Sequence, residues 1–269
     1  MNNIHLFQIA YSAEIAEQID SNYLILDNTQ NERPDWFEYW PIRKFLLKNE
    51  MIETDLYGFF SPKFETKTNL KHHEVCDFIH NNAANIDVFL FSPQPDMSAF
   101  FLNVFEQAEL FDSGTISVYE KFLDQIGKPT ELKSLVMDAR QIVFSNYFVA
   151  RPSFWRECLQ LNEAMFNLCE DKDSVLGQEL SAPTSYPRNV QRKVFLQERA
   201  ASYLLTTQPH WRSINYNPFA MAWSASRFRH FPTEAVISDA LKLAYKIYGH
   251  SEYLSAFAKI RKIFQSSTE

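Results

Sequence analysis

Short apolar runs alternate along this chain with longer segments that have helical periodicity. A run of about four to eight apolar residues is typical of a buried strand, and apolar residues three and four apart indicate one face of a helix. IDVFLFS (86–92) is the clearest strand, because its unbroken apolar run is typical of a strand buried on both faces. This alternation predicts an α/β fold, with a mostly parallel central sheet flanked by helices. The predicted strands span residues 4–11, 22–28, 56–61, 86–92 and 140–150.

The predicted helices lie between these strands and at the end of the chain. Pro41 predicts a break or kink in the second helix. The last two helices, 233–249 and 251–264, are predicted to form a C-terminal helical hairpin divided at Gly249. Residues 171–190 are the most loop-like segment, which we interpret as a mobile lid. The predicted helices span residues 12–19, 35–51, 70–83, 98–111, 116–127, 152–170, 191–206, 233–249 and 251–264.

Length and composition narrow the class of protein. The 269 residues suit one α/β domain with a helical appendage, and the net charge of −7 argues against general nucleic-acid binding. Three widely spaced cysteines form neither a disulfide framework nor a zinc pattern. The N-terminus lacks the features of a signal peptide, and no apolar stretch reaches the roughly 18 residues that span a bilayer. We therefore expect a soluble protein of the cytoplasm.

Several common site motifs are missing from the sequence. With 5 glycines and no GxGxxG, Walker or GxSxG motif, a glycine-rich nucleotide cradle and a nucleophile elbow are excluded. His73 and His80 share a helical face, but no HExxH or paired-cysteine spacing supports a zinc site. Asp171 and Asp173 match the Asp-x-Asp pattern that holds Mn²⁺ or Mg²⁺, but they follow a helix and no strand precedes them, which favours solvated loop charge.

Polar residues follow several predicted strands. Ligands of parallel sheets bind at the carboxyl ends of the strands, which selects residues 27–28, 61–68, 92–96 and 146–151. The segment SPKFETKT (61–68) carries two lysines and three hydroxyl side chains that suit a diphosphate, although an ordinary solvated turn fits as well.

A charge pair interrupts a later apolar helix. FLQERAASYLL (195–205) places Glu198 and Arg199 among apolar residues. Such a pair is either a buried structural ion pair or a catalytic carboxylate with its partner.

Four segments together resemble the glycosyltransferase-like proteins of bacterial capsule and lipopolysaccharide clusters, which have a GT-A-like fold. The segments are NERPDWFEYWPIRKFL, DLYGFFSPKFETKT, IDVFLFSPQPDMSAFFLNVFEQAE, and VFSNYFVARPSFWRECL with VFLQERAASYLL. The resemblance covers residues 22–215, so it implies a GT-A-like domain over 1–215 and a C-terminal helical extension over 216–269 packed on it. The chain departs from the family in having no Asp-x-Asp after a strand, so metal dependence stays open.

The resemblance implies roles for individual residues. Glu198 is the implied general base for an acceptor hydroxyl, and Asp96 is a second candidate. Gly58 would keep the backbone open where the donor approaches. The lysines would neutralise the leaving diphosphate in place of a metal. The implied donor-binding residues are Asn28, Asp35, Tyr57, Ser61, Lys63 and Lys67, and the implied acceptor-binding residues are Asn146, Tyr147, Trp155 and Arg199.

These features predict a cytoplasmic glycosyltransferase that moves a sugar from a nucleotide-sugar donor to an oligosaccharide or lipid-linked glycan of the cell surface. One alternative is a non-catalytic scaffold module of a polysaccharide-assembly complex. A sulfotransferase is another, but the first strand is not followed by the phosphate loop that such an enzyme needs. The C-terminal hairpin is a candidate for peripheral contact with the inner membrane, with packing on the domain as the other explanation. Its apolar stripe comprises Leu254, Phe257, Ala258, Ile260 and Phe264.

Overall fold

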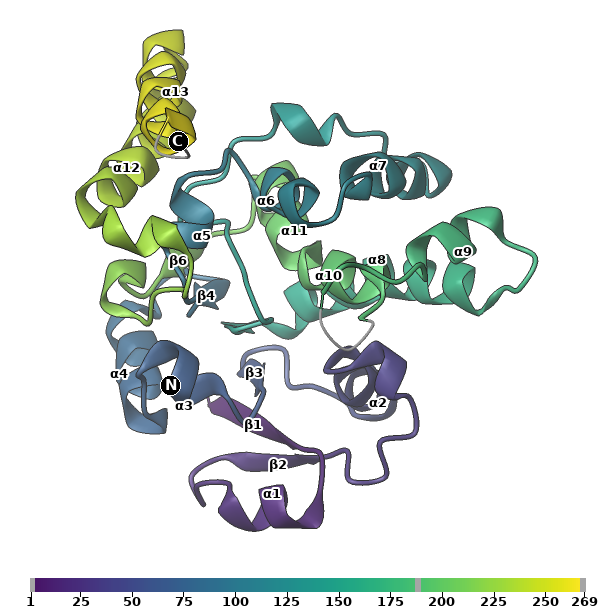
Figure 1. The fold of residues 1–269 in the computed structure, drawn as a ribbon. Coiled ribbons are helices and arrows are strands. Elements are labelled where there is room, and N and C mark those ends of the chain that lie inside the picture. Colours follow the sequence, from purple (N-terminus) through teal and green to yellow (C-terminus); the bar gives the residue numbers. More distant parts are fainter. Residues whose placement is uncertain (1–2, 187–189, 267–269) are drawn as a thin grey trace.

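The computed structural model describes residues 3–186 and 190–266, without the side chains of 263–266. A central sheet with helices on both faces forms the body of the molecule (Figure 1). The strand order is β2-β1-β3-β5-β4-β6, and every neighbouring pair is parallel except those that β5 makes. The α/β class with a mostly parallel sheet is therefore confirmed. The strands are β1 (Ile4–Ala10), β2 (Leu24–Asp27), β3 (Leu56–Phe60), β4 (Val88–Leu90), β5 (Phe148–Ala150) and β6 (Ser213–Asn215).

Two apolar cores cover the two faces of the sheet. Alternate side chains of a strand point to opposite faces, so Phe59 joins one core and its neighbour Phe60 joins the other. The larger core packs the sheet against α2 (Tyr39–Lys48), α6 (Val104–Phe111), α7 (Thr115–Gln125), α8 (Pro152–Glu170) and α11 (Ala200–Thr207). The smaller core packs the other face against α3 (Phe64–Thr68) and α4 (His72–Asn82).

Several predicted elements have different bounds in the structure. The strand predicted over 140–150 is ordered as β5 in its last three residues only. The helix predicted over 98–111 is divided into α5 (Asp96–Ala99) and α6, because Asn103 caps the amide groups of Phe105 and Glu106. The helix predicted over 191–206 is divided at Arg199 into α10 (Arg192–Glu198) and α11.

Other corrections concern loops and short elements. The helix predicted over 35–51 is broken just before Pro41, since a short 3-10 helix covers 34–36 and α2 begins at Tyr39. Pro41 then lies in the first turn of α2, which tolerates proline without a kink. The loop predicted over 171–190 contains a helix, α9 (Val175–Leu180), and its residues 187–189 lie outside the described part of the chain. The remaining short elements are α1 (Ala13–Gln18), η1 (Pro34–Trp36), η2 (Leu132–Ser134), η3 (Pro218–Ala220) and η4 (Arg227–His230).

The C-terminal segment forms two helices, α12 (Pro232–Tyr248) and α13 (Ser251–Ser266), with Gly249 in the left-handed conformation between them. They lie at the end of the molecule opposite β2 and α1 (Figure 1). Phe257 is 1% exposed, and Ile260 packs against a cluster that includes Phe100 and Phe101. These members of the predicted apolar stripe therefore face the protein, which favours packing over membrane contact; the side chain of Phe264 lies outside the described residues. No helix in the described part of the chain is long and apolar enough to span a membrane.

Candidate active site

The carboxyl ends of the parallel strands and the amino end of β5 lie together along one side of the sheet. We call this row of strand ends the carboxyl edge. The β3–β5 pairing joins Tyr57 with Ala150 and Gly58 with Val149 in antiparallel register. Because β5 runs the opposite way, the residues before it lie beside the residues that follow β3. Ser61 Oγ and Tyr147 Oη accordingly lie 2.6 Å apart. This edge is the one that ligands of such sheets use.

Two carboxylates at this edge interact through their charges. Glu38 lies directly before α2, and Glu198 is the last residue of α10. Burial raises the pKa of Glu38 to about 8, and the negative charge of Glu198 adds to that shift. Burial also raises the pKa of Glu198, and the positive charges of Arg199 and Lys67 oppose it. The two groups are therefore more stable with one proton between them than with two negative charges. The negative charge of Glu198 raises the pKa of Glu38.

Lysines and phenols surround the carboxylates. Lys67 Nζ donates a hydrogen bond to Ser145 Oγ at 2.8 Å and lies 5.5 Å from the centre of the Tyr147 ring. Both Lys67 and the exposed Lys63 lower the pKa of Glu38 through their positive charge. Burial raises the pKa of the Tyr11 and Tyr147 phenols, and the charge of Glu38 raises both further. The phenols therefore stay protonated and can donate hydrogen bonds.

A strained turn carries two of the polar groups. Ser145 and Asn146 have φ values of 58° and 54°, a left-handed conformation that is uncommon for residues other than glycine. Such strain persists only where the surrounding structure enforces it. Here the Ser145 hydroxyl binds Lys67, and Asn146 lines a neighbouring cavity.

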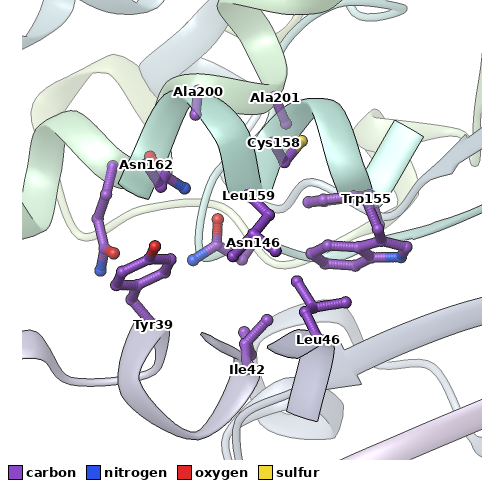
Figure 2. A pocket seen from close by; sticks show the side chains of 12 residues that line it. Tyr39, Ile42, Leu46, Asn146, Trp155, Cys158, Leu159, Asn162, Ala200 and Ala201 are labelled. Carbon is purple, nitrogen blue, oxygen red and sulfur yellow. The ribbon is translucent and has the colours of Figure 1, made fainter. Parts of the chain in front are cut away.

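This cavity lies between α2, α8 and the junction of α10 with α11, and it has about 20 Å³ of free space (Figure 2). That volume holds about one water molecule. Figure 2 shows the Asn146 carboxamide pointing into the space between Tyr39 and Asn162. The lining residues are Tyr39, Ile42, Leu46, Asn146, Phe148, Trp155, Cys158, Leu159, Asn162, Gln197, Ala200 and Ala201.

The structure brings together seven of the residues predicted from the sequence. Five of them contact or electrostatically influence one another around the carboxylate pair: Ser61, Lys63, Lys67, Tyr147 and Glu198. Asn146 and Trp155 line the adjacent cavity. The Trp155 indole N–H donates to the Tyr57 carbonyl at 2.9 Å and its ring stacks on Phe148.

Asn28 lies at the same edge of the sheet, immediately after β2. Its backbone N–H donates to the Ala10 carbonyl, and the residue is 2% exposed. Within the described residues, Asn28 Oδ1 has no hydrogen-bond partner. The position suits the predicted donor-binding role, which stays a prediction.

Tyr57 lies in the sheet interior. Its ring stacks on His5, and its hydroxyl accepts a hydrogen bond from the Ile52 amide. Gly58 is needed for packing, since a Cβ atom there would lie 2.8 Å from Val149 Cγ2 and 3.2 Å from Leu6 Cδ2. The expectation that Gly58 opens the backbone to a ligand is therefore wrong.

Asp35 and Asp96 belong to other clusters. Asp35 accepts hydrogen bonds from Arg33 and from Lys193 Nζ at 2.8 Å, in an ion network that includes Glu170. Asp96 is fully buried at the start of α5, where it accepts hydrogen bonds from the hydroxyl groups of Ser224 and Ser226 and from the Ser224 amide. Its hydrogen bonds fix the 224–226 segment and do not reach the carboxylate pair.

The Arg199 side chain hydrogen-bonds to groups other than its neighbour Glu198. Its guanidinium donates to the Val104 carbonyl, the Phe195 carbonyl and Gln107 Oε1 at 2.9, 2.6 and 2.7 Å. The residue is 5% exposed, and burial lowers its pKa to about 10. These bonds give Arg199 a structural role in holding α10 and α11, in place of the acceptor contact implied by the resemblance.

Two members of the site were missed in the sequence, Glu38 and Tyr11. Tyr11 directly follows β1, so the rule that selected the ends of the other strands applies to it as well. Glu38 is an acidic residue among the aromatic residues of WFEYW, where a carboxylate is expected to be buried. Both signals were available without the structure.

The candidate metal ligands are dispersed. Within the described residues, no group of three or more His, Cys, Asp or Glu side chains is arranged to hold a metal ion. Asp171 ends α8, and its carboxylate accepts a hydrogen bond from the Asp173 amide in an exposed turn. Asp171 and Asp173 therefore form a helix-ending turn.

Comparisons with protein-family models, with curated proteins and with solved structures give no match to this chain.

Proposed function

We propose that this chain is a glycosyltransferase that moves a sugar from a nucleotide-sugar donor to a growing cell-surface polysaccharide of the capsule or lipopolysaccharide type. The observation that carries the proposal is the pair of Glu38 and Glu198 at the carboxyl edge of the sheet, with Lys67 beside both. Perturbed carboxylates with a cation at a ligand-binding edge are the groups that this transfer needs. The mostly parallel sheet is compatible with a GT-A-like domain carrying a C-terminal helical hairpin.

Glu198 acts as the general base in this proposal. A base must accept a proton near neutral pH, and burial raises the pKa of Glu198 in that direction. Glu38 stays protonated at neutral pH, since its pKa is about 8. The Ser61 hydroxyl hydrogen-bonds to Glu38 and connects it to Tyr147.

Lys67 and Lys63 stabilise the leaving diphosphate. They lie four residues apart around α3, so they share a face of that helix. Both positive charges act on Glu38. Fixed cations directed at a developing negative charge are an effective form of transition-state stabilisation.

The transfer step uses these groups together. The acceptor hydroxyl oxygen forms a bond to the anomeric carbon of the donor sugar, while the bond from that carbon to the diphosphate oxygen breaks. The hydroxyl proton passes to Glu198, and the electron pair of the broken bond remains on the diphosphate near the lysines. A nucleotide-sugar donor and a glycan acceptor, lipid-linked at the cytoplasmic membrane surface or free, supply all the atoms of this step.

Thermal stability with candidate donors tests the proposal. A panel of nucleoside diphosphates and nucleotide sugars is added with and without Mn²⁺, and a ligand at about a hundred times its Kd stabilises by about 2.7 kcal/mol. We expect one nucleotide class to raise the midpoint in wild type and in Glu198→Gln. The Glu198→Gln variant should lose transfer by at least about 100-fold.

Glu17→Gln is the matched control, because Glu17 is exposed on α1. It should transfer sugar at the wild-type rate. If no donor shifts the midpoint of any variant, the glycosyltransferase proposal fails and a scaffold module of a polysaccharide-assembly complex takes its place.

A further inference from the structure

Helix α12 lies at one end of the molecule (Figure 1) and carries apolar side chains on the side that faces away from the protein. Four large apolar side chains, each between 44% and 61% exposed, lie near its two ends, and two alanines lie between them. Their spacing of three or four residues from turn to turn puts all six on one side of the helix. We call this set the outer face of α12. It comprises Val236, Ile237, Ala240, Ala244, Ile247 and Tyr248.

Three of the four charged side chains of α12 are directed toward the protein instead. Asp239 accepts a hydrogen bond from the Ala139 amide at 2.9 Å. Lys246 pairs with Asp138 at 3.4 Å, and Lys242 is fully buried. A surface helix normally buries its apolar side and exposes its charges. The reversed arrangement leaves an uncharged apolar patch in contact with water, and such patches mark surfaces that bind another molecule.

The outer face of α12 is complementary to a second copy of itself. Its members lie 2, 5 and 6 residues on either side of position 242 along the helix. In an antiparallel pair of helices related by a two-fold axis, residues equally far from the axis on its two sides lie opposite each other. Ala240 of one copy then lies opposite Ala244 of the other, and the bulky ends pack on each other. The small alanine side chains let the two helices approach closely at the centre.

The charges beside the outer face fit the same pairing. Glu234 lies in the first turn of α12, and His250 directly follows the C-cap Gly249. Glu234 and His250 each lie 8 residues from position 242. The antiparallel pair therefore brings the carboxylate of one copy near the imidazole of the other, twice in each dimer. Opposite polar groups at the rim of an interface fix its register.

The size of the outer face sets the strength of the association. Six side chains with this exposure present roughly 500 Å² per copy, so the pair buries about 1,000 Å², which is the lower limit for a specific interface. We therefore expect a reversible dimer with a Kd of about 10 μM.

We propose that the outer face of α12 is the interface of a two-fold symmetric homodimer, in which α12 of one copy packs antiparallel on α12 of the other. A membrane surface selects neither the symmetric spacing nor the central alanines. A helix that binds anionic lipid also directs its lysines to the membrane, whereas Lys242 and Lys246 are bonded to the body of the protein. The assembly is independent of the proposed transfer reaction.

Sedimentation velocity of the full chain tests the proposal over a range from about 1 to about 200 μM. The weight-average mass should rise with concentration from that of one chain, 31.5 kDa, toward twice that value. A mass that stays at that of one chain throughout would overturn the proposal. Flotation of the chain with phosphatidylglycerol vesicles in that case would assign the outer face to a membrane instead.

Two charge substitutions test the antiparallel register. Ala240→Glu and Ala244→Lys each place a charge in the apolar centre, so each variant alone should dimerise at least about tenfold more weakly than wild type. In an equimolar mixture, the new carboxylate of one chain lies opposite the new ammonium of the other. The mixture should therefore associate with a Kd within about threefold of the wild-type value. A mixture that associates no better than either variant would overturn the antiparallel pairing.

Ser255→Glu is the matched control, because Ser255 is exposed on α13 and lies outside the outer face of α12. It should dimerise as wild type does. The thermal midpoint of each variant shows that the chain is folded, and the concentration series of the wild type decides the matter even if a variant does not fold.

Discussion

At the scale of single residues, Glu38 links the site to the stability of the protein. Its pKa is about 8 in the folded chain and near 4.5 when exposed, so the folded state binds more protons between these values. Stability therefore falls as the pH rises from about 5 to 8. We expect Glu38→Gln to remove this loss and to raise the free energy of unfolding at pH 8 by about 2 kcal/mol over wild type, with little difference at pH 4.5. Urea unfolding at both pH values measures the change.

Glu50→Gln is the control for this prediction, because Glu50 is exposed at the start of the loop that follows α2. It should leave the pH dependence of stability as in wild type. If Glu38→Gln shows the same decrease between pH 5 and 8 as wild type, another group carries the proton and the assignment of Glu38 is wrong.

At the scale of elements, the junction between α10 and α11 determines where Glu198 lies. Arg199 forms this junction through three hydrogen bonds, two to Val104 and Gln107 of α6 and one to Phe195 of α10. Lysine reaches fewer of these oxygens because it lacks the planar guanidinium. We expect Arg199→Lys to lower the free energy of unfolding by about 3 kcal/mol, since it leaves buried acceptors unpaired. Denaturant unfolding measures this loss.

Arg156→Lys is the matched control, because Arg156 forms an exposed pair with Glu53. It should change the free energy of unfolding by no more than about 1 kcal/mol. If the two substitutions lower the free energy of unfolding equally, the buried hydrogen bonds of Arg199 do not stabilise the junction between α10 and α11.

The same elements show what the sequence could predict. The α/β class followed from unbroken apolar runs such as 86–92, because burial on both faces needs such a run and little else. The break at Arg199 could not be predicted, because it depends on hydrogen bonds to residues 92 and 95 positions away. Apolar content also predicted a strand over 140–150, but only its last three residues find partners in β3 and β4. Long-range partners decided both outcomes.

In the candidate site too, local sequence features could be predicted and long-range contacts could not. Glu198 and Lys67 were predicted from local features, a charge inside an apolar helix and a lysine after a strand. Their meeting with Glu38 depends on the packing of α2, α3 and α10 around one edge of the sheet, which no local pattern contains.

At the scale of the whole molecule, the C-terminal segment is attached to the body by several independent contacts. Lys242 is fully buried, and its ammonium donates to the Ser98 and Phe101 carbonyls at 2.9 and 3.0 Å. Arg261 pairs with Glu106 at 2.8 Å, and Ala235 packs into the cluster around Phe100 and Phe101. These contacts join α12 and α13 to α5, α6 and the turn between them. The C-terminal helices and the sheet domain should therefore unfold together.

Removal of residues 232–269 tests this joint stability. The deletion removes Ala235 and Ile260 from the apolar cluster around Phe100 and Phe101 and exposes the rest of that cluster, a loss of about 5 kcal/mol. We expect the thermal midpoint to fall by about 10 °C in differential scanning calorimetry. A chain lacking only residues 267–269 is the control and should keep the wild-type midpoint.

The full-length chain should show a single transition, because one cooperative unit unfolds at once. Two separate transitions, or an unchanged main transition after the deletion, would mean that the C-terminal helices are an independent unit.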